Sequence, residues 1–361
     1  MLERLTVPGP DAPVDLVAVH IREYQAPLAS ADWPAQTGRR RQAGADSGAG
    51  RPAQTAAYSA RMDYESVVAA SFQASPPDAV SAPTVQASPA RRLRDAIEPI
   101  AMHSVWSRAT NERLAEMDLD FLTGYVWGRA AALGEPDAGV VVAAFAVFEP
   151  GLVRDAYEQG RRACPRDRLL AARTDATVAS LLATLEGADV TSVADILERA
   201  VSVADGTGRP LFSGLAGQPW PADPVGRLWR ACELVREHRG DSHVAACISR
   251  GLGPVDMNIL TELWVGMPLG SYSGTRGWAH DTIRSAAATL ERTGLLEGDR
   301  LSPAGQTFRD ELEAATDAMQ QPVIEALGAD VESLIEQLAA WSQRCIGAGA
   351  FPPDVFKRAA G

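Results

Sequence analysis

The sequence predicts a mainly α-helical protein that begins with a long tail of low complexity. Hydrophobic residues make up 46% of the 361 residues, so the chain can bury a sizeable core. From Arg91 onward, apolar residues recur at helical spacing. Residues 1–90 are instead rich in Ala, Pro, Ser, Gly and Gln, a composition that buries too little apolar surface to offset the ordering of the backbone. We therefore expect residues 1–90 to be mostly disordered, with Met62 as an alternative start of the protein.

The composition also narrows the classes of function. A formal net charge of -12 disfavours a protein that coats nucleic acid or an anionic membrane, although a local basic patch could still bind DNA. No apolar run reaches the roughly 18 residues of a membrane span, and the amino terminus lacks the pattern of a signal peptide. The four cysteines form no CxxC pair and no dense disulfide framework. These features predict a cytoplasmic protein with no membrane partner.

Motifs for catalysis and cofactor binding are absent from the sequence. It contains no glycine-rich phosphate loop, no GxSxG elbow, no HExxH motif and no signature of a cysteine nucleophile. His238 and His243 are five residues apart, unlike the i, i+4 spacing of a helical zinc pair. We therefore expect no catalytic residue, no metal and no cofactor, and an enzyme is the less expected class.

Helical segments fill residues 91–220, which we predict to form a helical amino-terminal domain. In "ARRLRDAIEPIAMHSVW" the residues Leu93, Ile97 and Ile100 are spaced by four and three, as on one face of a helix. The segment "GVVVAAFAVFEPGLVRDAY" is interpreted as a second helix that starts after Asp137, and "RLLAARTDATVASLLATLE" and "SVADILERAVSVA" as two more. The Gly- and Pro-rich "GTGRPLFSGLAGQPWPADP" then predicts a connection to the second half.

A second domain is predicted over residues 221–345, with a tail at 346–361. Its first helix is expected to start near Asp223 and to run through "PVGRLWRACELVREHRG", where Gly240 would end it.

The rest of this domain carries the most informative pattern. A helix is expected to end near Val265 and a second to run from about Trp278 to Arg292, followed by a tight hairpin in "GLLEGDRLS" and a helix starting at Ser302 and Pro303. The residues expected to face the core are Ile283, Ala287, Leu290 and Leu295. This order, with "LERTGLL" before the hairpin and "LSPAG" after it, resembles the winged helix-turn-helix of MarR-like regulators.

Over a longer range, the "REHRGDSH" segment, "GRAAALG" and "RGW" resemble a two-part actinobacterial helix-turn-helix family across roughly residues 91–345. Only one of the 34 basic residues is a lysine, Lys357, which is typical of a high-GC genome. The resemblance implies a helical bundle followed by a winged helix-turn-helix, and a ligand-responsive transcriptional regulator that binds double-stranded DNA as a homodimer. The alternative is a small-molecule-binding protein or an enzyme with a pocket around "REHRGDSH".

The two halves also show a loose parallel. "LRDAIEPIAMHSVW" parallels "LWRACELVREHRGDSH", and each is followed by an aromatic residue, a Leu-Gly turn and an apolar helix. If the parallel holds, the molecule is a tandem of helix-turn-helix units in which His103 and His243 occupy related places.

Candidates for DNA contact lie on the second helix of the helix-turn-helix and on the hairpin. Such a helix enters the major groove in the proteins that this segment resembles. The residues expected to face DNA are Arg276, His280, Arg284, Ser285 and Arg300. Residues 252–320 nevertheless hold five arginines and ten acids, and this balance of -5 opposes docking on phosphates. The alternative is a helix-turn-helix kept for packing or dimerisation.

The stretch "REHRGDSHVAAC" has two interpretations. We favour a helix junction, in which Gly240 ends one helix and Asp241 caps the next. In the alternative, Arg239, Asp241 and His243, joined by His103, bind an anionic small molecule as a regulator's effector or an enzyme's substrate. Five tryptophans would either line an aromatic pocket or pack in the core: Trp106, Trp127, Trp229, Trp264 and Trp278.

Overall fold

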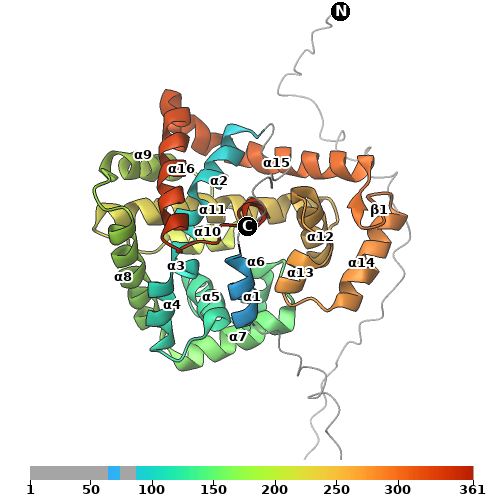
Figure 1. Cartoon of the computed structure of the whole chain (residues 1–361), viewed down its shortest axis with the longest axis horizontal. Coiled ribbons are helices and arrows are strands. Elements are labelled where there is room, and N and C mark those ends of the chain that lie inside the picture. Colours follow the sequence, from blue (N-terminus) through green and yellow to red (C-terminus); the bar gives the residue numbers. More distant parts are fainter. Residues whose placement is uncertain (1–63, 74–86, 361) are drawn as a thin grey trace, which may run out of the picture. The chain divides into compact units, whose positions relative to one another are not determined.

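The computed structural model describes residues 64–73 and 87–360, and in these residues the predicted mainly α-helical fold is confirmed (Figure 1). The sheet found in this part of the chain is a two-stranded hairpin. Most of the predicted tail, residues 1–90, lies outside the described residues, as does Met62. Within the same ranges, none of the helices is long and apolar enough to cross a membrane.

The helices before residue 220 are mostly short. They are α1 (Tyr64–Ser71), α2 (Pro89–Ala101), α3 (His103–Trp106), α4 (Arg108–Ala115), α5 (Phe121–Ala130), η2 (Ala131–Leu133), α6 (Ala138–Phe145), α7 (Pro150–Ala163), α8 (Arg166–Thr184), α9 (Thr191–Val201) and α10 (Pro210–Ala216).

Longer helices dominate the second half. Its elements are α11 (Pro224–Ser249), α12 (Pro254–Val265), α13 (Ser271–Thr275), α14 (His280–Arg292), β1 (Leu296–Glu297), β2 (Arg300–Leu301), α15 (Pro303–Leu327), η3 (Gly328–Asp330), α16 (Val331–Gly347) and α17 (Val355–Ala360).

One predicted helix is two in the structure. The segment after Asp137 was expected to be continuous, but α6 ends at Phe145, Ala146 takes a positive φ of 41°, and α7 begins at Pro150. Proline lacks the N–H that would continue the helix, and it is favoured in a first helical turn. The break leaves the carbonyl of Val147 free to accept a hydrogen bond from the Trp278 indole at 2.9 Å. The apolar composition of this segment predicts one helix, because local composition carries no information about a contact with a residue as distant in the sequence as Trp278.

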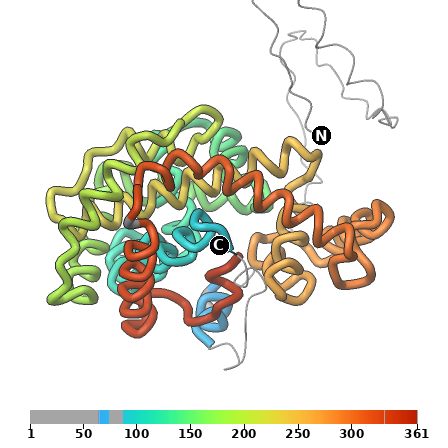
Figure 2. The backbone as a smooth tube through the Cα atoms, turned by 90° about the horizontal axis from the view of Figure 1, so that it is seen from above, coloured from blue at the N-terminus to red at the C-terminus, as the bar shows by residue number. Residues whose placement is uncertain are grey.

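Helix α11 is the centre of the molecule. It packs against α2, α8, α9, α10 and α15, and Figure 2 shows α15 running alongside it. The largest core cluster joins α11 to α2, α9 and α16, and its fully buried members include Ile97, Leu197, Trp229 and Leu338. This cluster therefore draws on residues from both sides of the connection at residue 220.

The predicted helix end at Gly240 is wrong. Helix α11 is continuous from Pro224 to Ser249, and Gly240 keeps a helical conformation in its middle. Glycine costs an interior helical position only about 1 kcal/mol, and burial of residues on both sides of Gly240 exceeds that cost. The interpretation of "REHRGDSH" as a helix junction is therefore also wrong, because Asp241 lies inside α11 and does not cap a following helix.

Gly240→Ala is expected to stabilise the protein by about 0.5–1 kcal/mol, because alanine restricts the unfolded chain and favours the helix. A Cβ at this position would meet no atom within 4 Å, so no clash offsets the gain. Urea unfolding of the two proteins measures the difference. A loss of stability would show instead that Gly240 is needed in a left-handed conformation.

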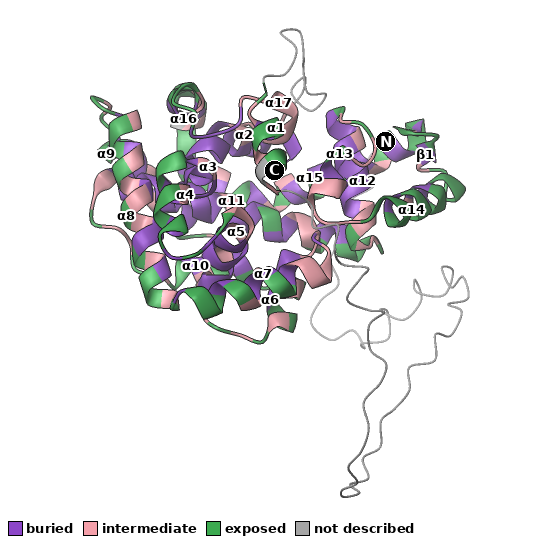
Figure 3. Ribbon diagram, turned by 60° about the horizontal axis from the view of Figure 1, so that its bottom comes forward, coloured by how far each residue is buried: buried purple, intermediate pink, exposed green. Residues whose placement is uncertain are grey.

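The carboxy-terminal half contains the predicted order of helix, turn, helix and hairpin. Leu296 pairs with Leu301 across the hairpin. Ile283, Ala287 and Leu290 of α14 are buried against α12, and Leu295 packs partly buried beside them, as predicted. In Figure 3 the outer face of α14 is exposed, so one side of this helix is free for a partner.

Residues 346–361, expected to be a tail, contain the helix α17. Ala359 and Ala360 are buried against Trp264 and Tyr272. The Ala359 carbonyl accepts a hydrogen bond from the Arg91 guanidinium at 2.6 Å. The carboxy-terminal end therefore closes one side of an interior cavity.

Candidate functional site

An interior cavity of about 140 Å³ lies between the early helices and the helix-turn-helix segment. Side chains from α2, α5, α6, α11, α12, α13, α15 and α17 line it. Seven of the lining residues are arginines: Arg91, Arg94, Arg129, Arg236, Arg239, Arg276 and Arg309. So many guanidinium groups around one cavity mark it as the strongest candidate for a ligand site.

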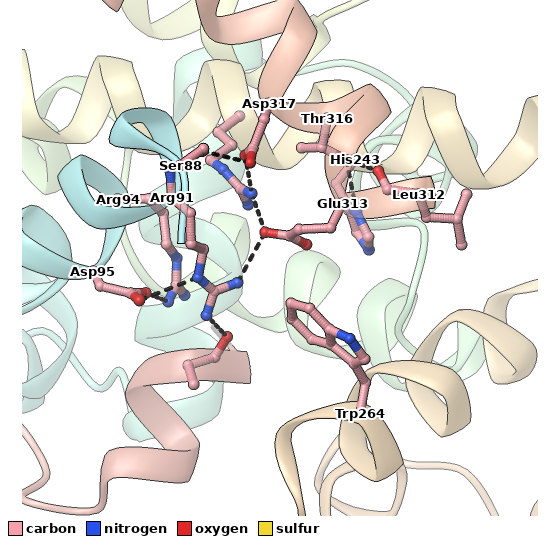
Figure 4. Close-up of polar contacts among 12 residues, drawn as sticks. Ser88, Arg91, Arg94, Asp95, His243, Trp264, Leu312, Glu313, Thr316 and Asp317 are labelled. Carbon is pink, nitrogen blue, oxygen red and sulfur yellow. Dashed lines mark hydrogen bonds and ion pairs between the residues drawn. The ribbon is translucent and has the colours of Figure 1, made fainter. Parts of the chain in front are cut away.

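Glu313 of α15 holds three of these arginines, and Figure 4 shows its contact with Arg91. Its Oε1 accepts hydrogen bonds from Arg91 at 3.1 Å and from Arg239, and its Oε2 accepts one from Arg309 at 2.9 Å. Burial opposes ionisation of Glu313, but the charges of Arg239, Arg309 and Arg91 outweigh burial and hold the pKa of this carboxyl far below its usual range. Glu313 therefore stays ionised and neutralises part of the cluster.

A second carboxylate, Glu237, organises the opposite wall. Arg129 donates to both of its oxygens, at 3.0 and 2.7 Å, and Arg236 donates at 3.2 Å. Burial would raise the pKa of Glu237, but Arg129 and Arg236 bring it below its usual value. Arg236 also contacts Glu98 of α2 at 3.1 Å, so the two networks tie α2, α5 and α11 together.

Arg276 differs from the other six arginines. Among the described residues, no carboxylate forms an ion pair with it. Its guanidinium lies 4.0 Å from the ring centre of Tyr272 and 4.9 Å from that of Phe148, and its Nη1 donates to Thr275 Oγ1 at 3.1 Å. The predicted role of Arg276 in DNA contact does not fit this position, because the side chain faces the cavity. The backbone reverses at Gly277, which has a φ of +85°.

Three of the four predicted ligand residues reach the cavity. Arg239, Asp241 and His243 line it from α11. Asp241 accepts the backbone N–H of Phe212 at 3.0 Å, and burial raises the pKa of Asp241 to about 7. His243 lies 3.1 Å from Thr316 Oγ1, and burial lowers the pKa of His243 to about 3, so the ring is neutral.

The structure places His103 elsewhere. This residue is fully buried at the start of α3, where its Nε2 lies 2.8 Å from Ser180 Oγ and burial lowers its pKa to about 4. The expected repeat would bring His103 and His243 to related places, yet α2 ends at Ala101 and α3 begins at His103, whereas α11 continues past His243.

A smaller cavity of about 80 Å³ adjoins the first. Seven of its sixteen lining residues are aromatic, among them Phe351 and the pair Trp106 and Phe121, whose ring centres are 5.3 Å apart. Four are charged: Glu98, Arg236, Arg276 and Lys357. Of the five tryptophans considered above, Trp106 is the one that lines this space, while Trp127 and Trp229 are fully buried in core clusters. The two cavities share Tyr125, Phe148, Arg236, Tyr272 and Arg276.

Four cavity arginines lie outside the stretches interpreted as a ligand site or DNA contact: Arg91, Arg94, Arg129 and Arg309. Arg236 is the first residue of "REHRGDSH" but is not among the predicted ligand residues. A signal exists for two of the four. Arg91 and Arg94 lie three residues apart on α2, and Arg94 lies four residues before Glu98, so all three flank the apolar stripe of that helix. No group of three or more His, Cys, Asp or Glu residues in the described ranges could hold a metal ion.

The turn of the helix-turn-helix depends on a buried carboxylate. Glu262 of α12 is fully buried and accepts the backbone N–H groups of Gly270, Tyr272 and Ser273 at 2.7, 2.8 and 2.9 Å. The Ser273 hydroxyl donates to it as well, at 2.9 Å. Glu262 thus accepts the backbone N–H groups that the first turn of α13 leaves without helical partners. It thereby holds the turn that precedes α14.

The candidate DNA contacts other than Arg276 are exposed on α14 and β2. His280, Arg284 and Ser285 lie on the outer face of α14, and Arg300 lies on β2. Arg284 pairs with Asp299 of the hairpin at 2.9 Å, and both side chains remain exposed. Such a pair contributes little to stability, so Arg284 can exchange this partner for another anion.

The fold and the site therefore define a mainly α-helical protein with a helix-turn-helix and an arginine-lined cavity beside it. A family model described as "Helix-turn-helix family" matches residues 90–352, and the chain belongs to this family. No curated protein and no solved structure shows a significant match to the chain.

Proposed function

We propose that the protein is a transcriptional regulator that binds double-stranded DNA through a winged helix-turn-helix and responds to an anionic small molecule in its interior cavity. The family supports the DNA-binding part of the proposal. In it, α14 enters the major groove and the β1–β2 hairpin acts as a wing beside the phosphate backbone. A homodimer belongs to the proposal, because a second copy would present a second α14 to a neighbouring half-site.

The observation that carries this proposal is the position of Arg276. Its side chain lines the cavity, while its backbone ends α13 only four residues before α14 begins at His280. Its carbonyl also accepts the N–H of Glu149 at 2.9 Å, which ties the turn to the start of α7. A ligand that binds the Arg276 guanidinium would therefore shift the segment between α13 and α14, and with it the orientation of α14.

The mixed charge of α14 favours a second candidate, a small-molecule-binding protein or enzyme that does not bind DNA. Asp281 and Glu291 are exposed on the same helix as Arg284 and Arg292, so the helix carries no excess of positive charge. The two candidates share the cavity and differ in whether α14 contacts nucleic acid.

Arg284→Ala and Arg300→Ala are each expected to weaken DNA binding and to reduce its salt dependence by about one unit of slope, because each lost phosphate contact releases fewer counterions. Retention of genomic DNA fragments at two salt concentrations measures both effects. Arg108→Ala is the matched control, since Arg108 is exposed on α4 and pairs only with neighbouring Glu112. If the unmodified protein retains no fragment in a salt-dependent way, the second candidate replaces the first.

A further inference from the structure

The guanidinium of Arg276 has one edge that no residue of 64–73 or 87–360 pairs with. Its Nη1 donates to Thr275, but no described residue accepts a hydrogen bond from Nε, which is buried, or from Nη2. These two nitrogens form the edge of the guanidinium that a carboxylate meets with two parallel hydrogen bonds. Leaving the Nε donor buried and unpaired costs free energy, so the edge is suited to an anionic occupant.

Other buried polar atoms of the same cavity also lack partners within the described residues. They are Nε of Arg239, Nε of Arg309 and Oδ1 of Asn258. Asn258 is almost fully buried, and its amide nitrogen already donates to the Val147 carbonyl at 2.7 Å. Residues from more than one helix of the cavity lining therefore carry buried polar atoms that no described residue pairs.

Positive charge exceeds negative charge among the groups that line and pair across this cavity. Six of the seven arginines, all except Arg276, form ion pairs with five carboxylates, those of Asp95, Glu98, Glu237, Glu313 and Asp317. Asp241 also lines the cavity without an ion pair, and because burial raises its pKa to about 7 it is only partly ionised near neutral pH. The excess amounts to one or two charges, which an acid of low charge balances better than a polyphosphate does.

The aromatic cavity continues from the same arginine. Arg276 lines both spaces, with Tyr272 and Phe148 stacked against it where the spaces adjoin. Beyond them, Trp106, Phe121 and Phe351 offer apolar surface to whatever is attached to the acid group. The two spaces are small, which limits the attached group to a short chain or a single ring.

We propose that the two cavities form one binding site for an amphipathic carboxylate, whose acid group pairs with Arg276 in the arginine-lined cavity and whose short apolar body lies in the aromatic cavity. The proposal rests on the proposed function in one respect, since it names the class of the effector. The binding site itself is independent of DNA and can be tested without it.

Direct titration of the full chain tests the site with three probes: hexanoate, its neutral counterpart hexanamide, and acetate. We expect hexanoate to bind at least tenfold more tightly than either of the others, because it alone carries both the charge and the apolar body. Isothermal titration calorimetry gives the affinities, and the melting temperature should rise with hexanoate concentration.

Variants assign each part of the ligand to its cavity. Arg276→Gln should lower hexanoate affinity at least tenfold and leave hexanamide unchanged, and Arg276→Lys should recover only part of the loss, since lysine keeps the charge without the planar edge. Phe121→Ala should lower the affinity for hexanoate, because Phe121 lines the aromatic cavity, and should leave the affinity for acetate unchanged. Arg108→Gln, at an exposed arginine that lines neither cavity, is the control and should bind as the unmodified protein does.

Two outcomes would overturn the proposal. One is the absence of saturable hexanoate binding at about 10 mM, a concentration at which a millimolar dissociation constant is readily seen. The other is an equal loss of affinity for hexanoate and for hexanamide in an Arg276→Gln protein that still melts cooperatively. If the protein binds hexanoate but not DNA, the proposed function as a regulator is rejected, while the proposed carboxylate-binding site stands.

Discussion

Glu313→Gln is expected to lower the free energy of unfolding by roughly 3–5 kcal/mol, the usual cost of removing one partner from a buried ion-pair network. Glu313 is the carboxylate shared by Arg91, Arg239 and Arg309, and all four side chains are buried. A glutamine keeps the size of the side chain but removes the charge, so three guanidinium groups remain close together with less compensation. Denaturant unfolding followed by circular dichroism measures the loss.

The matched control for this experiment is Glu311→Gln on the same helix. Glu311 pairs with Arg250 at 3.1 Å, but both side chains are about half exposed, so the expected change is below about 0.5 kcal/mol. The pH dependence gives a second check. The folded-state pKa of Glu313 lies far below its unfolded value, so its contribution is complete above the unfolded pKa, near 4.5, and declines as pH falls below that value. The difference in free energy of unfolding between the unmodified protein and Glu313→Gln should therefore shrink on acidification. A difference that grows would contradict the assigned role of Glu313.

Glu262→Gln should have the next largest effect, a loss of about 2–4 kcal/mol together with loss of any DNA binding. Both carboxylate oxygens of Glu262 accept hydrogen bonds, from Gly270 to one and from Tyr272 and Ser273 to the other. An amide supplies only one acceptor oxygen, so its NH₂ group must face a backbone donor in a fully buried place. The turn before α14 would then lose the contacts that hold it.

Thermal melting and fragment retention on the same samples separate the two effects of Glu262→Gln. Glu297→Gln, at an exposed acid on β1, is the control and should change neither stability nor folding. A variant as stable as the unmodified protein would show that the turn is held by its glycines and not by Glu262.

The helix-turn-helix segment could be predicted from sequence because its signals are local. Ser302 caps α15 by accepting the N–H of Gly305 at 2.9 Å, as the "LSPAG" pattern indicates. The same pattern has a tertiary cause that the sequence does not reveal: a Cβ at Gly305 would lie 1.9 Å from the Leu295 carbonyl oxygen. Only glycine permits this approach of α15 to the strand before it.

The cavity could be predicted only in part. Arg239, Asp241 and His243 were recognisable as a cluster because they lie close together in the sequence, although the helix break predicted between them at Gly240 is absent. Their partners lie far away in the sequence: Arg91 and Glu313, which meet at 3.1 Å, are 222 residues apart. Periodicity describes one helix at a time, so it predicts neither such pairs nor the burial that makes Gly240 acceptable inside α11.

The packing of α2 against α16 has a consequence for how the chain folds. These helices are among the first and the last of the described residues, yet they complete the same core cluster, and the Ser342 hydroxyl donates to the Ala96 carbonyl. During synthesis, the part of α2 that packs against α16 remains uncovered until α16 has been made. Contacts this distant slow folding relative to other helical proteins of similar size, and partly folded chains expose surface that aggregates. We therefore expect refolding from denaturant to proceed through a populated intermediate, and chains truncated before α16 to depend on chaperones for solubility.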